Sequence, residues 1–226
     1  MARLIRSGQK IVEQRQKALF YAHRNVVIYL NTLSRLDLVK FYFEGSPAQQ
    51  PCIIMANHPS LLDFIIFLKD FPNAVCLYKT QTLDNPILSS FVQVAGYIQG
   101  MDGTPQASKR IISSCCERLR EGHHVVIFPE GTRSKRTTEM HKFRTTGFHA
   151  AIKGDVPIQP VAIHCKPLLL GKNQSWSDFS QEMNRITVRY LSPIMLCDLS
   201  PEMQNSSGLS DMVKESINTA LVELDS

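Results

Sequence analysis

The sequence of 226 residues has no long hydrophobic run, although 43% of its residues are hydrophobic. Its longest apolar stretches, such as residues 64–68, fall far short of the roughly 18 residues that a membrane-spanning helix needs. No adequate apolar segment follows the first arginines, so we do not expect a cleavable signal peptide. With 20% charged residues, the composition is typical of a folded protein and excludes a disordered one.

Patterns of metal ligands, disulfides and covalent nucleophiles are also missing. The six cysteines include no C-x-x-C pair, and most lie in strand-like apolar runs, which favours buried thiols in a reducing compartment. His123 and His124 are neighbours without a second pair at ligand spacing, so no metal site is predicted. Because the Gly-x-Ser-x-Gly elbow of hydrolases is absent, Ser60 or a cysteine is a weak candidate for an acylated nucleophile.

The net charge of +5 is concentrated at the N-terminus, where residues 1–40 hold eight Lys and Arg against two acidic residues. An apolar row and a basic row each recur there every seven residues, offset by two positions, and so lie on nearly opposite sides of a helix. This predicts an amphipathic helical segment over residues 1–36, followed by a domain over 37–226. The helix would lie on an anionic membrane, dock on the domain or form a coiled-coil seam. The apolar row is Ile5, Val12, Leu19, Val26 and Leu33, and the basic row is Arg3, Lys10, Lys17 and Arg24.

The remainder of the chain alternates between short apolar runs and helical patterns, which predicts an α/β fold. One helix is expected to start at Thr104-Pro105 and stop at Gly122, and Ser210 is expected to cap a last helix. The expected strands are residues 38–44, 51–56, 74–78, 94–98, 125–128, 158–163 and 186–190.

A histidine and an aspartate follow the strand that ends near residue 56. Pro59 suits the first position of the next helix, which leaves His58 on the entry turn with Asp63 able to reach back to its imidazole. A carboxylate there would fix the tautomer and leave the other ring nitrogen to accept a proton. This pattern predicts a general base that activates a substrate hydroxyl. Alternatively, His58 caps the helix and Asp63 favours its dipole.

A second polar cluster follows the strand at residues 125–128, where Pro129 ends the strand and Gly131 permits a tight turn. Arg133 beside the hydroxyl of Thr132 suits a phosphate, because guanidinium offers a planar fork of donors. An ordinary surface loop is the alternative. Further cations nearby strengthen the positive field, namely Lys135, Arg136, Lys142 and Arg144.

These residues together resemble the lysophospholipid acyltransferase superfamily, typified by bacterial 1-acyl-glycerol-3-phosphate acyltransferases. Its N-H-x4-D block is matched from Asn57-His58 to Asp63, its F-P-E-G-T-R-S block at Phe128–Ser134, and its V-P-I-x-P-V block at Val156–Val161. The interval containing Lys79 is also similar to the segment between the family's first two blocks. The similarity covers roughly residues 38–195, and three blocks in order make chance agreement improbable.

The resemblance implies a mixed, mostly parallel sheet flanked by helices, and acyl transfer from acyl-CoA or acyl carrier protein to a lyso-lipid hydroxyl in phospholipid biosynthesis. His58 would take the proton of the acceptor hydroxyl, and Asp63 would orient the His58 imidazole. Amides near His58 would stabilise the oxyanion. It implies neither a metal, a redox cofactor nor a nucleic-acid partner. It also favours the membrane interpretation of the N-terminal helix, on the cytoplasmic side and peripheral. The substrate-binding residues it implies are Asn57, Lys79, Glu130, Gly131, Thr132, Arg133 and Pro157.

One block departs from the family, because Asp102 stands where an arginine thought to hold the acceptor phosphate is usual. Two alternatives to 1-acyl-glycerol-3-phosphate acylation therefore stay open. The acceptor is another lysophospholipid or a lyso-aminolipid, or the protein is a non-catalytic, membrane-peripheral lipid-binding protein. If the acceptor does carry a phosphate, a cation such as Lys109 or Arg110 would have to compensate alongside Arg133.

Overall fold

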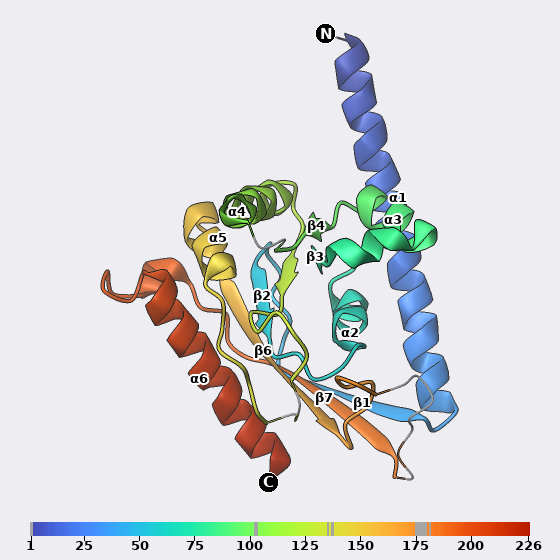
Figure 1. Cartoon of the computed structure of the whole chain (residues 1–226), viewed down its shortest axis with the longest axis vertical. Helices are drawn as coiled ribbons and strands as arrows, with labels where there is room; N and C mark the ends of the chain where they lie inside the picture. The colour runs from blue at the N-terminus through green and yellow to red at the C-terminus, as the bar shows by residue number, and fades with distance from the viewer. Residues whose placement is uncertain (1, 102–103, 135, 137, 175–179, 181) are drawn as a thin grey trace.

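The computed structural model describes residues 2–101, 104–134, 136, 138–174, 180 and 182–226, without the side chains of residues 2–8, 82, 87, 88 and 105. In this part of the chain a mixed sheet of seven strands, in the order β1-β7-β6-β2-β5-β3-β4, separates two groups of helices (Figure 1). The β6–β7 pair is antiparallel and the other pairs are parallel. The predicted α/β class with a mixed, mostly parallel sheet is confirmed.

The strand bounds are β1 Val39–Glu44, β2 Ile53–Ala56, β3 Val75–Tyr78, β4 Ile98–Gln99, β5 Val125–Ile127, β6 Ile158–Lys166 and β7 Asn184–Tyr190. The α-helices are α1 Ala2–Arg35, α2 Asp63–Asp70, α3 Pro86–Val94, α4 Pro105–Arg120, α5 Thr146–Gly154 and α6 Ser206–Asp225. Short 3₁₀-helices span Thr80–Asp84 and Leu196–Asp198.

Strand β2 shows why the sheet has a core on each face. All four of its residues are buried, and successive side chains point to opposite faces of a strand. Ile54 and Ala56 join the core that contains α2 and the later part of α1, whereas Ile53 and Met55 join the core against α4, α5 and α6. A strand covered on both faces needs a continuous apolar run, which is the pattern that residues 52–56 carry.

The predicted strand at residues 94–98 is wrong for most of its length. Residues 86–94 form α3, Gly96 turns the chain at a φ of 75°, and only Ile98 and Gln99 pair with β3. An apolar run of this length fits a helix face as well as a strand, and the packing of α3 against α1 decides between them here.

The last helix also begins earlier than predicted. Asn205 caps it, because its side-chain oxygen accepts the amide hydrogens of Ser207 and Gly208 at 3.1 and 2.9 Å. Ser210, the predicted cap, is instead a buried residue of the first turns. The predicted apolar face is confirmed, since Val213, Ile217, Ala220 and Leu221 are all buried.

The N-terminal helix α1 packs along the domain over its second half and projects beyond it at its start (Figure 1). Leu19 is buried, and Val26 and Leu33 pack against the core with α2. Arg15 also donates to the carboxylate of Glu121, at the end of α4. From Leu19 onward the apolar row therefore docks on the domain, which was one of the three alternatives, and does not face a membrane. Among the described helices, none is both long enough and apolar enough to cross a bilayer.

Candidate active site

His58 and Asp63 form a hydrogen-bonded pair where β2 passes into α2. His58 Nδ1 lies 2.7 Å from Asp63 Oδ2, and the same carboxylate oxygen accepts the amide hydrogen of Ser60 at 2.8 Å. The contact expected between the two side chains is confirmed. The helix begins at Asp63, so Pro59 belongs to the preceding turn and not to the first helical position as predicted.

The surroundings of the pair suit a base held by a buried acid. Burial raises the pKa of Asp63, and the hydrogen bonds from His58 and Ser60 oppose that rise. Asp63 has a fully buried side chain, whereas that of His58 is 20% exposed. The imidazole stacks on the ring of Phe128, with centroids 4.2 Å apart and an angle of 18° between the planes. With Nδ1 on Asp63, the second nitrogen, Nε2, is available to a ligand.

A groove of about 630 Å³ opens in front of His58. Of the predicted substrate-binding residues, it includes Lys79 and Gly131. Leu77, Ile111 and Val126 give the groove an apolar wall. Its volume lies in the range of ordinary ligand sites, and its lining joins apolar surface to a few polar groups. The groove can therefore hold a chain of methylene groups with a polar end close to the imidazole.

Glu130 lies behind the groove and is almost fully buried. Its carboxylate accepts the amide hydrogen of His58 at 3.0 Å, the hydroxyl of Ser134 at 3.0 and 2.9 Å, and the amide hydrogen of His141 at 2.7 Å. Both oxygens are thus occupied by protein donors. The structure makes Glu130 a link between the His58 turn and the loop before α5, and does not bring it to the groove as a headgroup ligand.

Asn57 and Pro157 also face the interior and do not line the groove. The Asn57 amide donates to the Ile163 carbonyl at 2.8 Å and accepts from the Ile163 amide at 2.7 Å, which extends the β2–β6 pairing by one residue. The Pro157 carbonyl accepts from Ile53 at the start of β2. These two residues hold neighbouring strands in register, although the resemblance implies substrate contact for them.

Arg133 is not part of the groove wall either. Its Nη1 donates to the carbonyls of Leu170 and Gly171 at 2.7 and 2.9 Å. Thr132 is half-buried and is not part of the groove wall. Arg144, which the sequence offers only as one of several nearby cations, does line the groove. The departure at Asp102 and the cation Lys135 lie outside the described residues.

The amides of the turn at residues 58–62 are already bonded within the protein. His58 donates to Glu130, Ser60 to Asp63, Leu61 to the Leu170 carbonyl and Leu62 to the Ser60 hydroxyl. Proline at position 59 has no amide hydrogen. The expectation that these amides hold an oxyanion is therefore wrong for this conformation.

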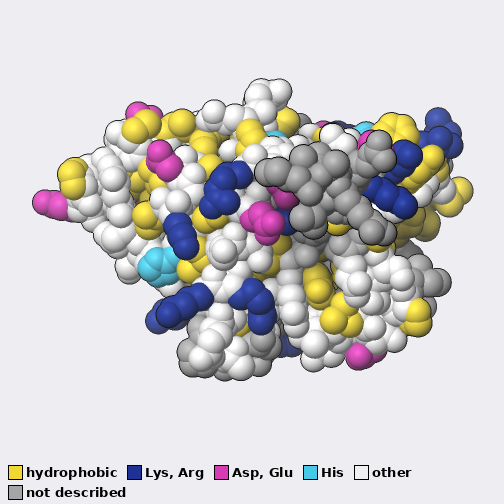
Figure 2. Space-filling view, turned by 90° about the horizontal axis from the view of Figure 1, so that it is seen from above, with side chains coloured by type: hydrophobic (Ala, Val, Ile, Leu, Met, Phe, Trp, Pro, Cys, Tyr) yellow, Lys and Arg dark blue, Asp and Glu magenta, His cyan; other side chains and the backbone are white. Residues whose placement is uncertain are grey.

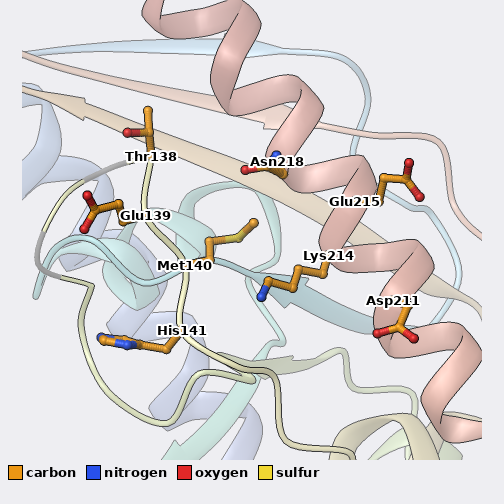
Figure 3. Close-up of a pocket in the computed structure, with 8 residues that line it drawn as sticks. All are labelled: Thr138, Glu139, Met140, His141, Asp211, Lys214, Glu215 and Asn218. Atoms are coloured by element: carbon orange, nitrogen blue, oxygen red, sulfur yellow. The ribbon is translucent and has the colours of Figure 1, made fainter.

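A second cavity of about 690 Å³ lies between the loop at residues 138–141 and α6 (Figure 3). Met140 and Lys214 point toward one another across it, while Glu139 and His141 extend to the other side of the loop. This cavity does not include His58. Within the described part of the chain, no three His, Cys, Asp or Glu side chains are grouped to hold a metal ion.

Comparisons with known proteins show the family and the fold. Residues 38–164 match the Acyltransferase family. The chain is 28% identical over 167 residues to a 1-acyl-sn-glycerol-3-phosphate acyltransferase of Cocos nucifera, covering 72% of this chain and 52% of that protein. It is 27% identical over 187 residues to 1-acyl-sn-glycerol-3-phosphate acyltransferase alpha of Mus musculus, covering 79% of this chain and 61% of that protein. The chain thus spans less than two thirds of the length of these relatives.

A solved structure shares the fold. The 1-acyl-sn-glycerophosphate acyltransferase PlsC from Thermotoga maritima aligns with a TM-score of 0.75, covering 97% of this chain and 89% of that one. The sequence identity of 21% limits this likeness to the architecture of the sheet and its helices.

Proposed function

Because the family match covers more than half of its residues, the chain belongs to the acyltransferase family, and we propose that it is an O-acyltransferase of lyso-lipids. It moves a fatty acyl group from an acyl-thioester to the hydroxyl of a lysophospholipid-type acceptor, with 1-acyl-glycerol-3-phosphate as the first candidate. The observation that carries this proposal is the His58–Asp63 pair, with Nδ1 bonded at 2.7 Å and the ring at the groove wall. A non-catalytic lipid-binding protein would have no need of an acid buried behind an accessible imidazole.

In the proposed reaction, His58 Nε2 removes the proton from the acceptor hydroxyl as its oxygen attacks the thioester carbonyl. Asp63 stabilises the imidazolium through Nδ1–H and keeps the ring in the orientation set by the stack on Phe128. The tetrahedral intermediate then collapses, the carbon–sulfur bond breaks, and the imidazolium returns its proton to the leaving thiolate. The products are an ester and a free thiol, and the protein itself is never acylated.

The apolar lining of the groove supports a binding place for the acyl chain. Leu77, Ile111, Val126 and Ile127 form an apolar wall against which an acyl chain loses contact with water. Acyl-CoA and acyl carrier protein both supply the thioester that this reaction needs. No step of the proposed reaction uses a metal or a redox cofactor.

We propose that the protein associates peripherally with the cytoplasmic side of a membrane, and the outer face of α1 supports association with a membrane surface. Lys10, Lys17 and Arg24 are exposed there, and helical geometry brings Tyr21 and Ile28, 57% and 54% exposed, to the same side. On the molecular face from which the N-terminal end of α1 projects, Lys and Arg side chains are interspersed with hydrophobic ones (Figure 2). Aromatic and aliphatic side chains among cations suit the boundary of an anionic bilayer.

The reaction is tested with the full chain and one labelled acyl-CoA against a panel of lyso-lipids with and without a phosphate. We expect transfer to at least one lyso-lipid, and a fall of about 10²–10⁴-fold for His58→Ala, the range of general-base catalysis. The exposed His149, replaced by alanine, is the matched control. If His58→Ala stays within a few-fold of the original protein, the base is misassigned. Transfer to no member of the panel would refute the function.

Membrane association is tested by co-sedimentation with anionic vesicles at low salt. Replacing Arg3, Lys10, Lys17 and Arg24 together by glutamine should release the protein, because each cation near such a surface contributes about 1 kcal/mol. Replacing the exposed cations Lys153 and Lys172 is the control for a general loss of charge. Unchanged co-sedimentation of the fourfold variant would refute a role for α1.

A further inference from the structure

The cation best placed for a phosphate in this protein is not the arginine of the F-P-E-G-T-R-S block. Arg133 Nη1 is bonded to two carbonyls, those of Leu170 and Gly171, and its side chain is not part of the groove wall. The Leu170 carbonyl also accepts the amide hydrogen of Leu61, in the turn that carries His58. Arg133 is thus a positioning residue that holds the loop at 170–171 against this turn.

Arg144, unlike Arg133, lines the groove. Its amide donates to the Pro129 carbonyl at 2.9 Å, which fixes its backbone beside the end of β5. Its guanidinium covers the bare face of Gly131, since a methyl group built on Gly131 would lie 3.0 Å from Nε and 3.1 Å from Cζ. Pro129, Gly131 and Arg144 all line the groove that contains His58.

Lys79 lines the same groove. In the described part of the chain, the side chains of Lys79 and Arg144 make neither an ion pair nor a hydrogen bond, whereas several other arginines, such as Arg118 and Arg189, are paired with glutamates. Two unpaired cations at one groove repel each other and leave a positive field there. An anionic ligand group that enters between them is attracted to both.

We propose that Arg144, together with Lys79, binds the phosphate of the acceptor lipid, and that this sets the preference for phosphate-bearing lyso-lipids. The inference rests on the proposed function. The phosphate is the acceptor's because the hydroxyl that His58 deprotonates lies only a few bonds from it in a glycerol phosphate. In acyl-CoA, the whole pantetheine arm separates the thioester from the nearest phosphate. A guanidinium supplies two parallel donors to phosphate oxygens, which an ammonium cannot.

The test compares Arg144→Gln and Arg144→Lys with Lys142→Gln, which removes an exposed cation two positions earlier that is not part of the groove wall. Each is assayed with 1-acyl-glycerol-3-phosphate and with 1-acyl-glycerol, which lacks the phosphate. For Arg144→Gln we expect the KM of the phosphate-bearing acceptor to rise about 10- to 100-fold, the loss of a charge-assisted contact. The KM of the phosphate-free acceptor, the KM of acyl-CoA and kcat should each stay within about threefold. The KM of Arg144→Lys for the phosphate-bearing acceptor should lie between those of Arg144→Gln and the original protein. Lys142→Gln should match the original protein.

Arg133→Gln separates the two arginines. It should lower the melting temperature and kcat, because it frees the loop at 170–171, and leave the KM for the acceptor nearly unchanged. An unchanged acceptor KM in Arg144→Gln, or a rise confined to the KM of acyl-CoA, would overturn the assignment. The same holds if Arg133→Gln raises the acceptor KM without loss of stability.

A binding measurement keeps this test independent of turnover. Calorimetric titration with glycerol 3-phosphate, with glycerol as the control, should show binding by the original protein and by Lys142→Gln that Arg144→Gln loses. If no lyso-lipid is acylated but glycerol 3-phosphate still binds through Arg144, the proposed function fails and the phosphate site stands. If acylation proceeds and glycerol 3-phosphate binding is indifferent to Arg144, the phosphate site fails alone.

Discussion

Replacing Glu130 by glutamine separates a positioning role from substrate binding. The carboxylate accepts the amide hydrogens of His58 and His141 and the hydroxyl of Ser134. Glutamine keeps one oxygen and turns an NH₂ group toward donors, so at least one amide hydrogen loses its acceptor. With bonds to a charged group at about 1.5–3 kcal/mol, we expect a loss of about 2–4 kcal/mol of folding free energy. In a chain of 226 residues this corresponds to a melting temperature lower by about 5–15 °C.

The effect on catalysis should appear in kcat. The Glu130 carboxylate links the backbone of His58 to that of His141, so loss of either bond loosens the turn that carries the imidazole. A misplacement of about 1 Å costs on the order of 100-fold in rate. We expect kcat to fall about 10- to 100-fold and the acceptor KM to change less than threefold. Glu139→Gln is the matched control, since Glu139 is exposed in the same region and pairs with Arg136 at the surface. A raised acceptor KM with unchanged kcat and melting temperature would show that Glu130 binds the headgroup and refute the reasoning.

Three further predictions follow from buried groups. Asp63→Asn should reduce kcat by about 10²–10⁴-fold, since the amide cannot stabilise the imidazolium, and a steady-state assay that finds less than tenfold would contradict this. Asn57→Ala should lower the free energy of unfolding by about 2–4 kcal/mol in urea titrations, because it leaves both the N–H and the C=O of Ile163 without their partner; a loss below 1 kcal/mol would count against it. Burial lowers the pKa of His124 to about 4 from 6.5, so the unfolded chain takes up a proton between these pH values that the folded one does not. Stability should therefore fall by at most about 3 kcal/mol as the pH drops through that window, and His124→Gln should flatten this slope in unfolding measured from pH 7 to pH 4.5.

The sequence predicts those features of the site that depend on neighbours along the chain. His58 and Asp63 are five positions apart, so a single turn decides whether they meet, and the strand before them carries a continuous apolar run. The start of the last helix is harder to predict, because Asn205 and Ser210 are both good caps. The packing of α6 against the sheet, which buries Ser210, decides between them. Strand β4 is two residues long, too short for any periodicity to reveal.

Features that depend on distant contacts cannot be predicted in this way. The motif places an arginine at 133, but whether it reaches a ligand depends on the carbonyls of residues 170–171, some forty positions later. Arg144 has no sequence signal beyond its charge. Its proposed role in phosphate binding depends on the fold, which places its guanidinium against Gly131. The seven-residue period of α1 suggests a lipid-facing stripe, yet periodicity reveals only which face is apolar, not what covers it.

The distribution of thiols makes this protein convenient to label. Five of its six cysteines are buried, and burial raises the pKa of Cys52, Cys115 and Cys165 to about 12, so these thiols rarely ionise at neutral pH. Cys197, in the 3₁₀-helix Leu196–Asp198, is exposed. A maleimide dye added to the native protein should therefore attach at one position, without any mutation. A reporter there, outside the groove wall, would allow vesicle docking to be followed by fluorescence in real time.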